Sequence, residues 1–387
     1  MRSPGCLLSH GLLRCGLIGV VALCLSCGGG GSSDVTAAGA GASSSEDSGA
    51  TAGSGGGGSG GMTDSGNEGS GGDGMAGTLL PRAMAATARG TCALDAQGGI
   101  HCWGLARLST SGWTVPQGPF VALFSSIDAV CAVRADGTFT CFPEPLGTPN
   151  DLSYIPDVTV RELAVGFGAF CGIAETGDPF CNWVNETYAI PVPPAERFDH
   201  ISVGERFACG IRDADGTILC WGSEGSGAAC DYTPQAGQLL APDGSFVELS
   251  SRTNSSCAVS VDGSLACWGA GGPADDPQAL ICDVPYNFGQ SIPPAGDFVS
   301  VTVGDSHACG IRADGTVACW GAGTTDQGCS STVLSFHCGQ SQAPPGRFEQ
   351  LALGNVHTCA MRADRTVQCW GWEGDGDGRT IPPPEFQ

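Results

Sequence analysis

The sequence contains no lysine, so all 16 basic residues are arginines, and they stand against 39 acidic residues. The missing lysine excludes a Schiff-base mechanism and the phosphate-binding lysine of a P-loop. The formal net charge of −23 also argues against a nucleic-acid partner, because affinity for the phosphate backbone needs clustered positive charge. Protein and glycan partners remain open.

The sequence also lacks an apolar run long enough to cross a bilayer near its start. The apolar run at residues 15–25 has about 11 residues, whereas a spanning helix needs roughly 20. Arg2 and Arg14 precede it, as in a signal peptide. The run ends in Leu-Ser-Cys-Gly, which resembles a bacterial lipoprotein lipobox with Cys27 as the lipid anchor. We therefore expect residues 1–27 to be a lipoprotein signal peptide, with an ordinary secretory signal as the alternative.

Large side chains are scarce in residues 28–78, which consist mostly of Gly, Ser, Ala, Asp and Glu. Such a segment buries too little apolar surface to offset the entropy of ordering the chain. The composition predicts a disordered tether between the anchor and a folded domain at residues 79–387.

Cysteine, in contrast, is abundant and periodic beyond residue 78. Seven pairs recur with their members ten or eleven residues apart: Cys92/Cys102, Cys131/Cys141, Cys171/Cys181, Cys209/Cys220, Cys257/Cys267, Cys309/Cys319 and Cys359/Cys369. Successive copies begin 38 to 52 residues apart, a period typical of a four-stranded propeller blade.

The stretch between two paired cysteines reads as a β-hairpin. In the sixth copy, a three-residue loop Ala313-Asp314-Gly315 would make Cys309 and Cys319 cross-strand neighbours, with Cα atoms about 4.5 Å apart. Zinc ligands usually have two to four residues between partners, the repeated cysteines form no CxxC redox motif, and a catalytic thiol would not recur seven times. The spacing therefore predicts cross-strand disulfides, as expected in an exported protein.

Four cysteines lie outside this pattern, in the long loops after copies four to six: Cys230, Cys282, Cys329 and Cys338. Pairing of Cys329 with Cys338 and of Cys230 with Cys282 is one of three possible arrangements, and the sequence leaves the choice open.

The repeat resembles that of the regulator of chromosome condensation family. The resemblance rests on stretches such as VTVGDSHACGIRADGTVACWG at residues 301–321 and LALGNVHTCAMRADRTVQCWG at 351–371. It implies an all-β, seven-bladed propeller. The eukaryotic member exchanges nucleotide on a nuclear GTPase and binds chromatin, but a signal peptide and an acidic surface argue against those roles here. The proline-rich lead that precedes most copies returns at the C-terminus as GRTIPPPEFQ, and we expect it to help close the ring.

The repeated polar residues predict no active site. Aspartates in the hairpin loops, such as Asp314, stand where a turn needs them, and the histidines form no constellation. The recurring tryptophans, such as Trp320, suit blade packing better than a sugar platform. Alternating carboxylates at Asp375 and Asp377 leave calcium binding open. We predict no cofactor, no resident metal and no enzymatic activity.

These observations predict a monomeric, non-catalytic cell-envelope lipoprotein that binds an unidentified protein or glycan. It would contact the membrane only through its lipid anchor, at the outer membrane or cell surface, or alternatively in the periplasm. The long loops after copies four to six are the predicted binding face. A structural envelope protein, or less favourably a propeller enzyme of the sialidase or lyase type, is the alternative.

Overall fold

The structure is a computed structural model. It describes residues 82–387 except 105–113, 128, 143–157, 184–188, 223–236, 273–287, 327–328, 330–335 and 375. The expected signal peptide, its Cys27 and the tether lie outside these residues. All described residues belong to one compact unit, residues 72–387. None of the helices in the described part is long and apolar enough to cross a membrane.

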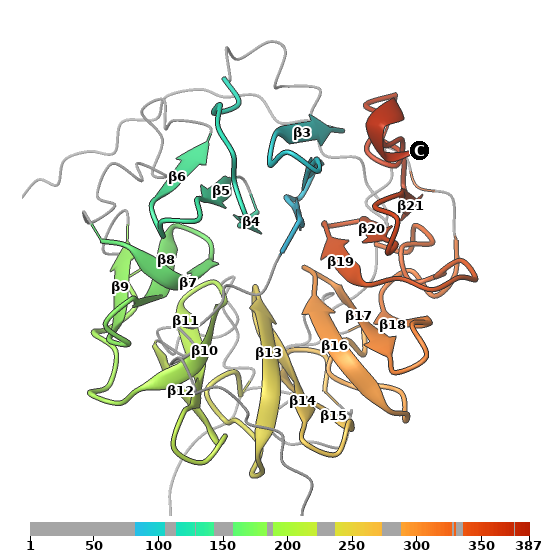
Figure 1. Cartoon of the computed structure of the whole chain (residues 1–387). Coiled ribbons are helices and arrows are strands. Elements are labelled where there is room, and N and C mark those ends of the chain that lie inside the picture. The colour runs from blue at the N-terminus through green and yellow to red at the C-terminus, as the bar shows by residue number, and fades with distance from the viewer. Residues whose placement is uncertain are drawn as a thin grey trace, which may run out of the picture. The chain divides into compact units, whose positions relative to one another are not determined.

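The described residues fold into seven antiparallel sheets of three strands each, arranged as blades around a central axis (Figure 1). The first three blades contain β1 (Met84–Ala86), β2 (Thr91–Leu94) and β3 (Ile100–Trp103); β4 (Ala122–Ser125), β5 (Val130–Val133) and β6 (Phe139–Phe142); and β7 (Val160–Val165), β8 (Ala169–Ala174) and β9 (Pro179–Trp183).

The other four blades contain β10 (Phe198–Val203), β11 (Phe207–Arg212) and β12 (Ile218–Gly222); β13 (Phe246–Arg252), β14 (Ser255–Ser260) and β15 (Leu265–Gly269); β16 (Phe298–Val303), β17 (His307–Arg312) and β18 (Val317–Gly321); and β19 (Gln350–Leu353), β20 (His357–Met361) and β21 (Val367–Gly371). A short 3-10 helix, η3 (Pro384–Phe386), follows.

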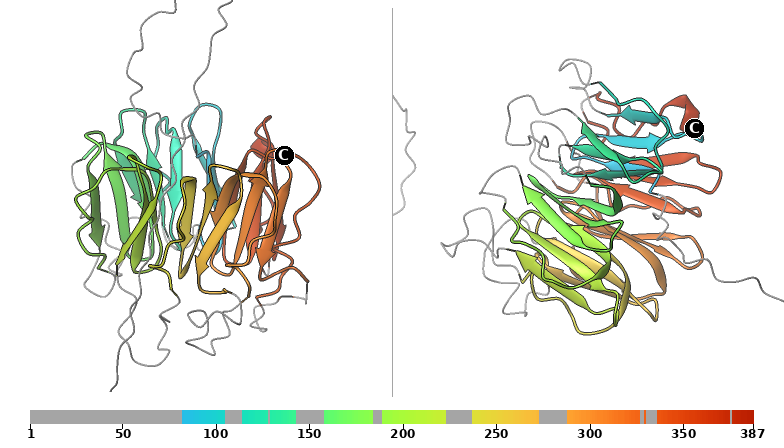
Figure 2. Two further views of the ribbon diagram at one scale, coloured as in Figure 1. Left: turned by 90° about the horizontal axis from the view of Figure 1, so that it is seen from below. Right: turned by 60° about the vertical axis from the view of Figure 1, so that its left-hand side comes forward.

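The first strand of every blade is the innermost, and these inner strands contact one another in order around the axis, with β19 returning to β1. The ring is therefore closed, and the predicted all-β, seven-bladed propeller is confirmed. Because the strands of each blade alternate in direction, their ends gather at two opposite faces (Figure 2). We call the face where the inner strands begin the turn face, and the face where the inner and outer strands end the loop face.

Among the described residues each blade has three strands, one fewer than in the four-stranded blade whose repeat period the sequence matches. The segment that would supply the fourth strand is the proline-rich lead, for example around Pro293 and Pro294. Proline has no N–H to donate to a ladder. The lead crosses to the next blade. At the start of that blade the Phe298 N–H donates back to Gly263 O of the preceding blade, at 2.7 Å.

Each blade has the predicted cross-strand disulfide between its middle and outer strands. In the sixth blade Cys309 is opposite Cys319, and Ile311 is opposite Val317. Across the seven bonds the Cα atoms lie 3.9 to 4.0 Å apart, closer than the expected separation of about 4.5 Å. The seven bonds are Cys92–Cys102, Cys131–Cys141, Cys171–Cys181, Cys209–Cys220, Cys257–Cys267, Cys309–Cys319 and Cys359–Cys369.

The two cysteines of each bond differ in burial. The first, on the middle strand, is at most 1% exposed in every blade. The second, on the outer strand, is only half-buried, because the outer strand is the edge of its blade. This set comprises Cys102, Cys141, Cys181, Cys220, Cys267, Cys319 and Cys369. All seven still pack against the apolar clusters between blades, so each bond links the core to the outer edge.

An eighth disulfide joins Cys329 and Cys338, whose Cα atoms lie 5.4 Å apart. This is one of the pairings that the sequence left open. Cys230 and Cys282 lie outside the described residues, so their pairing stays a prediction.

The hydrophobic core lies between neighbouring blades. One cluster, for example, contains Ile311 of the sixth blade with Phe348 and Leu353 of the seventh. The recurring tryptophans belong to this packing: the Trp320 indole N–H donates to Gln290 O at 2.8 Å, inside the protein. The structure thus favours the packing role of the tryptophans over a sugar platform.

The C-terminal lead packs onto the first blade. Its Phe386 is only 2% exposed and belongs to the core cluster of that blade. The Phe386 and Trp103 rings lie 6.1 Å apart, as Phe298 and Trp320 lie 6.5 Å apart in the sixth blade. Phe386 therefore packs on the first blade as Phe298 packs on the sixth.

Arg365 forms a second contact between the last blade and the first. It occupies the turn position where other copies have glycine, with φ 68°, a left-handed conformation that is uncommon for residues with a side chain. Its Nη2 donates to Leu94 O at 2.5 Å and to Asp95 O at 3.2 Å. The loss of glycine in the seventh copy thus provides a guanidinium that ties the last blade to the first.

Candidate functional site: the central channel

The polar residues that recur between copies serve the scaffold. Asp314 accepts hydrogen bonds from Thr316 N at 2.9 Å and from Thr316 Oγ1 at 2.7 Å, and these bonds lower the pKa of the Asp314 carboxyl. The same pair of bonds is made by Asp136, Asp215, Asp262 and Asp364. These aspartates stabilise hairpin turns.

His307 and His357 connect neighbouring blades. Nε2 of His307 lies 2.8 Å from Thr358 Oγ1, and Nε2 of His357 lies 3.1 Å from Thr91 Oγ1. Both imidazoles are fully buried, and burial lowers the pKa of each to about 3. The two histidines are therefore neutral interface residues at physiological pH.

Part of the acidic stretch near the C-terminus is paired with an arginine of the same segment. Asp377 forms an ion pair with Arg379, and the Arg379 guanidinium lies 4.8 Å from the Trp372 ring centroid. Asp375 lies outside the described residues, and elsewhere in the described ranges no group of three or more His, Cys, Asp or Glu side chains could hold a metal ion.

Some residues that differ between copies line the central channel, a cavity of about 450 Å³ lined by the inner strands. An inner strand is an edge strand, and its unpaired backbone groups need partners. Side chains of the adjacent blades supply them. Ser202 Oγ accepts from Ser251 N at 2.7 Å, and Ser250 Oγ accepts from Val303 N at 3.0 Å. Serine at these positions holds adjacent blades together along the channel.

The cysteines singled out from the sequence lie apart from this channel. The paired cysteines stand on the middle and outer strands, so neither the buried members nor the half-buried ones line the cavity. The outer-strand members Cys141, Cys181, Cys220 and Cys267, like Cys102, Cys319 and Cys369, are structural residues and not part of the candidate site. The sequence therefore located the scaffold residues and not the channel residues.

A polar belt occupies the position nine residues before the first cysteine in the third to seventh copies, and its members Glu248, Ser300 and Gln350 line the channel. The residues of this belt are Glu162, His200, Glu248, Ser300 and Gln350. His200 Nδ1 lies 3.4 Å from Glu162 Oε2, and Ser300 Oγ donates to Glu248 Oε1 at 3.2 Å.

The surroundings of the belt shift the pKa of two of its residues, His200 and Glu248. Burial alone would lower the pKa of His200, but its hydrogen bond to Glu162 and the charge of that carboxylate outweigh burial and raise the pKa. Burial raises the pKa of Glu248, opposed by the charge of Arg82 and the Ser300 hydrogen bond. Perturbed groups beside a cavity mark a candidate functional site. Sequence reasoning missed it, although charged residues at this register in three consecutive copies were a usable signal.

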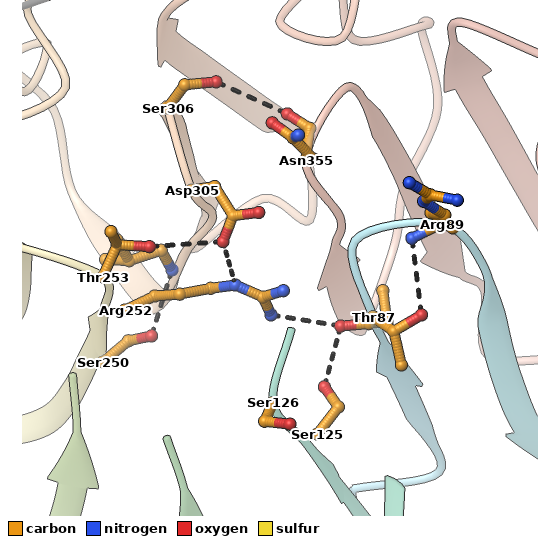
Figure 3. Close-up of polar contacts among 12 residues, drawn as sticks. Thr87, Arg89, Ser125, Ser126, Ser250, Arg252, Thr253, Asp305, Ser306 and Asn355 are labelled. Carbon is orange, nitrogen blue, oxygen red and sulfur yellow. Dashed lines mark hydrogen bonds and ion pairs between the residues drawn. The ribbon is translucent and has the colours of Figure 1, made fainter. Parts of the chain in front are cut away.

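Arg252 reaches across the loop-face end of the channel (Figure 3). Its Nε lies 2.6 Å from Asp305 Oδ1, and its Nη1 donates to Ala86 O at 3.1 Å. The guanidinium thus joins the fifth blade to the sixth and to the first. Thr253 Oγ1 also contacts Asp305 Oδ1, at 3.3 Å, and the backbone of Thr253 has φ 46°. A positive φ at a β-branched residue is strained and is often found at functional sites.

Comparison with known proteins agrees with this architecture. Residues 298–327 and 348–377 match the family model of the regulator of chromosome condensation (RCC1) repeat. Two of the seven blades thus match this repeat, and the fold of the described residues is an RCC1-like β-propeller.

Two plant receptor kinases have similar ectodomains. The entire ectodomain of CR4 from Physcomitrella patens superposes with a TM-score of 0.56 at 20% identity, covering 75% of this chain and 73% of that one. The CRINKLY WD40 ectodomain of ACR4 from Arabidopsis thaliana gives 0.53 at 20% identity, covering 76% and 93%. At this identity the similarity concerns the fold alone.

Proposed function

We propose that this protein is a non-catalytic binding module of an exported cell-envelope lipoprotein, and that it engages a protein or glycan through its loop face. The proposal rests on the contrast between two sets of residues, those that recur in the repeats and those in the connections between blades. Repeated polar side chains stabilise turns and blade interfaces, whereas the connections after the outer strands, which differ most in length and sequence, leave from one face. Variable loops on a rigid scaffold are typical of binding surfaces.

Export is supported by the eight disulfides among the described residues, since such bonds persist in oxidising compartments. The lipobox-like sequence at Cys27 supports anchoring at the outer membrane or cell surface. Membrane fractionation of the full chain against a Cys27→Ser variant tests this placement: equal membrane association of the two would contradict it.

Loop replacement tests the binding face. We expect replacement of residues 223–236 and 273–287 by Gly-Ser segments of equal length to lower affinity at least about tenfold for a partner purified by affinity capture from envelope extract. Contact loops contribute to binding, whereas the disulfide-bonded blades keep their stability. The matched control replaces residues 143–157, and that variant should bind normally.

Affinity should be measured by titration with the purified partner, and stability by thermal unfolding. Equal loss in the control, or no loss in either variant, would refute the assignment of the binding face. A structural envelope protein would yield no saturable partner. An enzyme of the channel would instead lose an activity in Glu248→Gln.

A further inference from the structure

Arg252 departs from the repeat at a position where small side chains are the rule. Five residues before the first cysteine, the other copies have Thr87, Ser126, Gly166, Gly204, Gly304 and Gly354. The backbone is crowded there: a Cβ on Gly166 would lie 2.3 Å from Gly204 O. A blade therefore forms without a long side chain at this position, and the repeat itself does not require an arginine.

The guanidinium of Arg252 is only partly satisfied. Its Nε and Nη1 have the partners Asp305 and Ala86 O, but Nη2 is buried with no hydrogen-bond partner among the described residues. A buried charged donor left unpaired is costly and calls for an acceptor. Arg252 also lines the channel, so a ligand in the channel can provide that acceptor once the guanidinium turns Nη2 towards the cavity.

The other groups lining the channel define the ligand. Eight hydroxyl side chains line it: Ser125, Ser126, Ser202, Ser250, Ser251, Thr253, Ser300 and Thr302. Arg82, a second guanidinium, lies 5.5 Å from the Phe124 ring centroid and also lines the channel. The volume of about 450 Å³ falls within the roughly 300–1,000 Å³ of small-molecule sites.

The charges around the channel decide which kind of anion fits it. Asp305 adjoins the Arg252 guanidinium, Glu248 and Glu349 line the channel, and the whole chain is strongly acidic. These negative charges disfavour a dianion such as a phosphate monoester. A single carboxylate can accept from Nη2 of Arg252 while its neighbouring hydroxyl groups bond to serine and threonine.

We propose that the central channel binds a small hydroxylated carboxylic acid of the uronic-acid type, with its carboxylate on Arg252. This site is separate from the loop-face partner, and either can fail without the other. A free sugar acid and the acidic end of a glycan share this chemistry. A short oligouronate and the monomer, titrated in parallel, distinguish the two sources.

Isothermal titration of the full-length protein, with its disulfides intact, tests the proposal with D-glucuronate as the probe. Glucuronate should bind saturably, whereas glucose, which lacks the carboxylate, should bind at least about tenfold more weakly because a charge-assisted hydrogen bond is lost. Glucose 6-phosphate should also bind more weakly than glucuronate. No saturable glucuronate binding at millimolar concentrations, or equal binding of glucose, would overturn the proposal without a variant.

Arg252→Gln should lower glucuronate affinity at least about tenfold, since the amide carries no charge. Arg197→Gln is the control, because Arg197 is 61% exposed and paired with Asp213 outside the channel lining. Unliganded melting temperatures show whether each variant is folded. Unchanged affinity in folded Arg252→Gln would overturn the role of Arg252, as would an equal loss in Arg197→Gln.

Discussion

Lowering the pH from 7 to 5 is expected to reduce the free energy of unfolding by about 4 kcal/mol. Burial holds the pKa of His307 and His357 at about 3 in the folded state, whereas in the unfolded chain both histidines titrate near 6.5. A depressed folded pKa gives stability that is present above the unfolded pKa and is lost as the pH falls towards the folded one. Each histidine contributes about half of the loss.

Urea unfolding at pH 7, 6 and 5 and constant ionic strength measures this effect. His200 opposes it in part, because its raised folded pKa gives stability that is present below pH 6.5 and is lost as the pH rises through the folded value. His357→Gln should have about half the pH dependence of the wild type. Equal stability at pH 7 and pH 5 would show that the two imidazoles are not buried as described.

Phe386→Ala is expected to destabilise the domain by about 3 kcal/mol, the loss typical of a buried aromatic side chain replaced by alanine. Phe386 packs against Trp103 and the core of the first blade, so its removal opens the seam between the last blade and the first. Deletion of residues 381–387 should cost at least as much. Denaturant unfolding monitored by tryptophan fluorescence measures both effects.

Ile381→Ala is the matched control on the same lead. Ile381 is 53% exposed, and substitutions at such surface positions usually change stability by less than about 0.5 kcal/mol. If Phe386→Ala is no less stable than Ile381→Ala, the C-terminal lead does not close the ring.

The sequence predicts the blade well because the decisive interactions are local. Gly315 in a three-residue loop places Cys309 opposite Cys319, and this register depends only on turn geometry and strand alternation. Seven copies in the same register then imply a closed ring. The repeat period alone does not give the number of strands per blade, because it measures chain length, whereas a strand also needs backbone donors, which the paired prolines lack.

The channel was not predictable in the same way. Glu162, His200 and Glu248 come from three consecutive blades, and only the packing of these blades against one another brings the three side chains together. Arg252 bonds to Ala86 O across 166 residues of sequence. Each residue occupies an ordinary inner-strand or turn position within its own copy, and only the register across all seven copies sets it apart.

The central claim is that each of the seven recurring cysteine pairs forms a disulfide within one hairpin of a closed scaffold. The recurring residues are then structural, and the binding residues are those that differ between copies. A non-reducing peptide map of the purified full-length protein tests this most directly. The account predicts a disulfide within every hairpin, including Cys92–Cys102 at the first blade and Cys359–Cys369 at the last, together with Cys329–Cys338. Free thiols at these positions, or disulfides joining cysteines of different repeats, would contradict it.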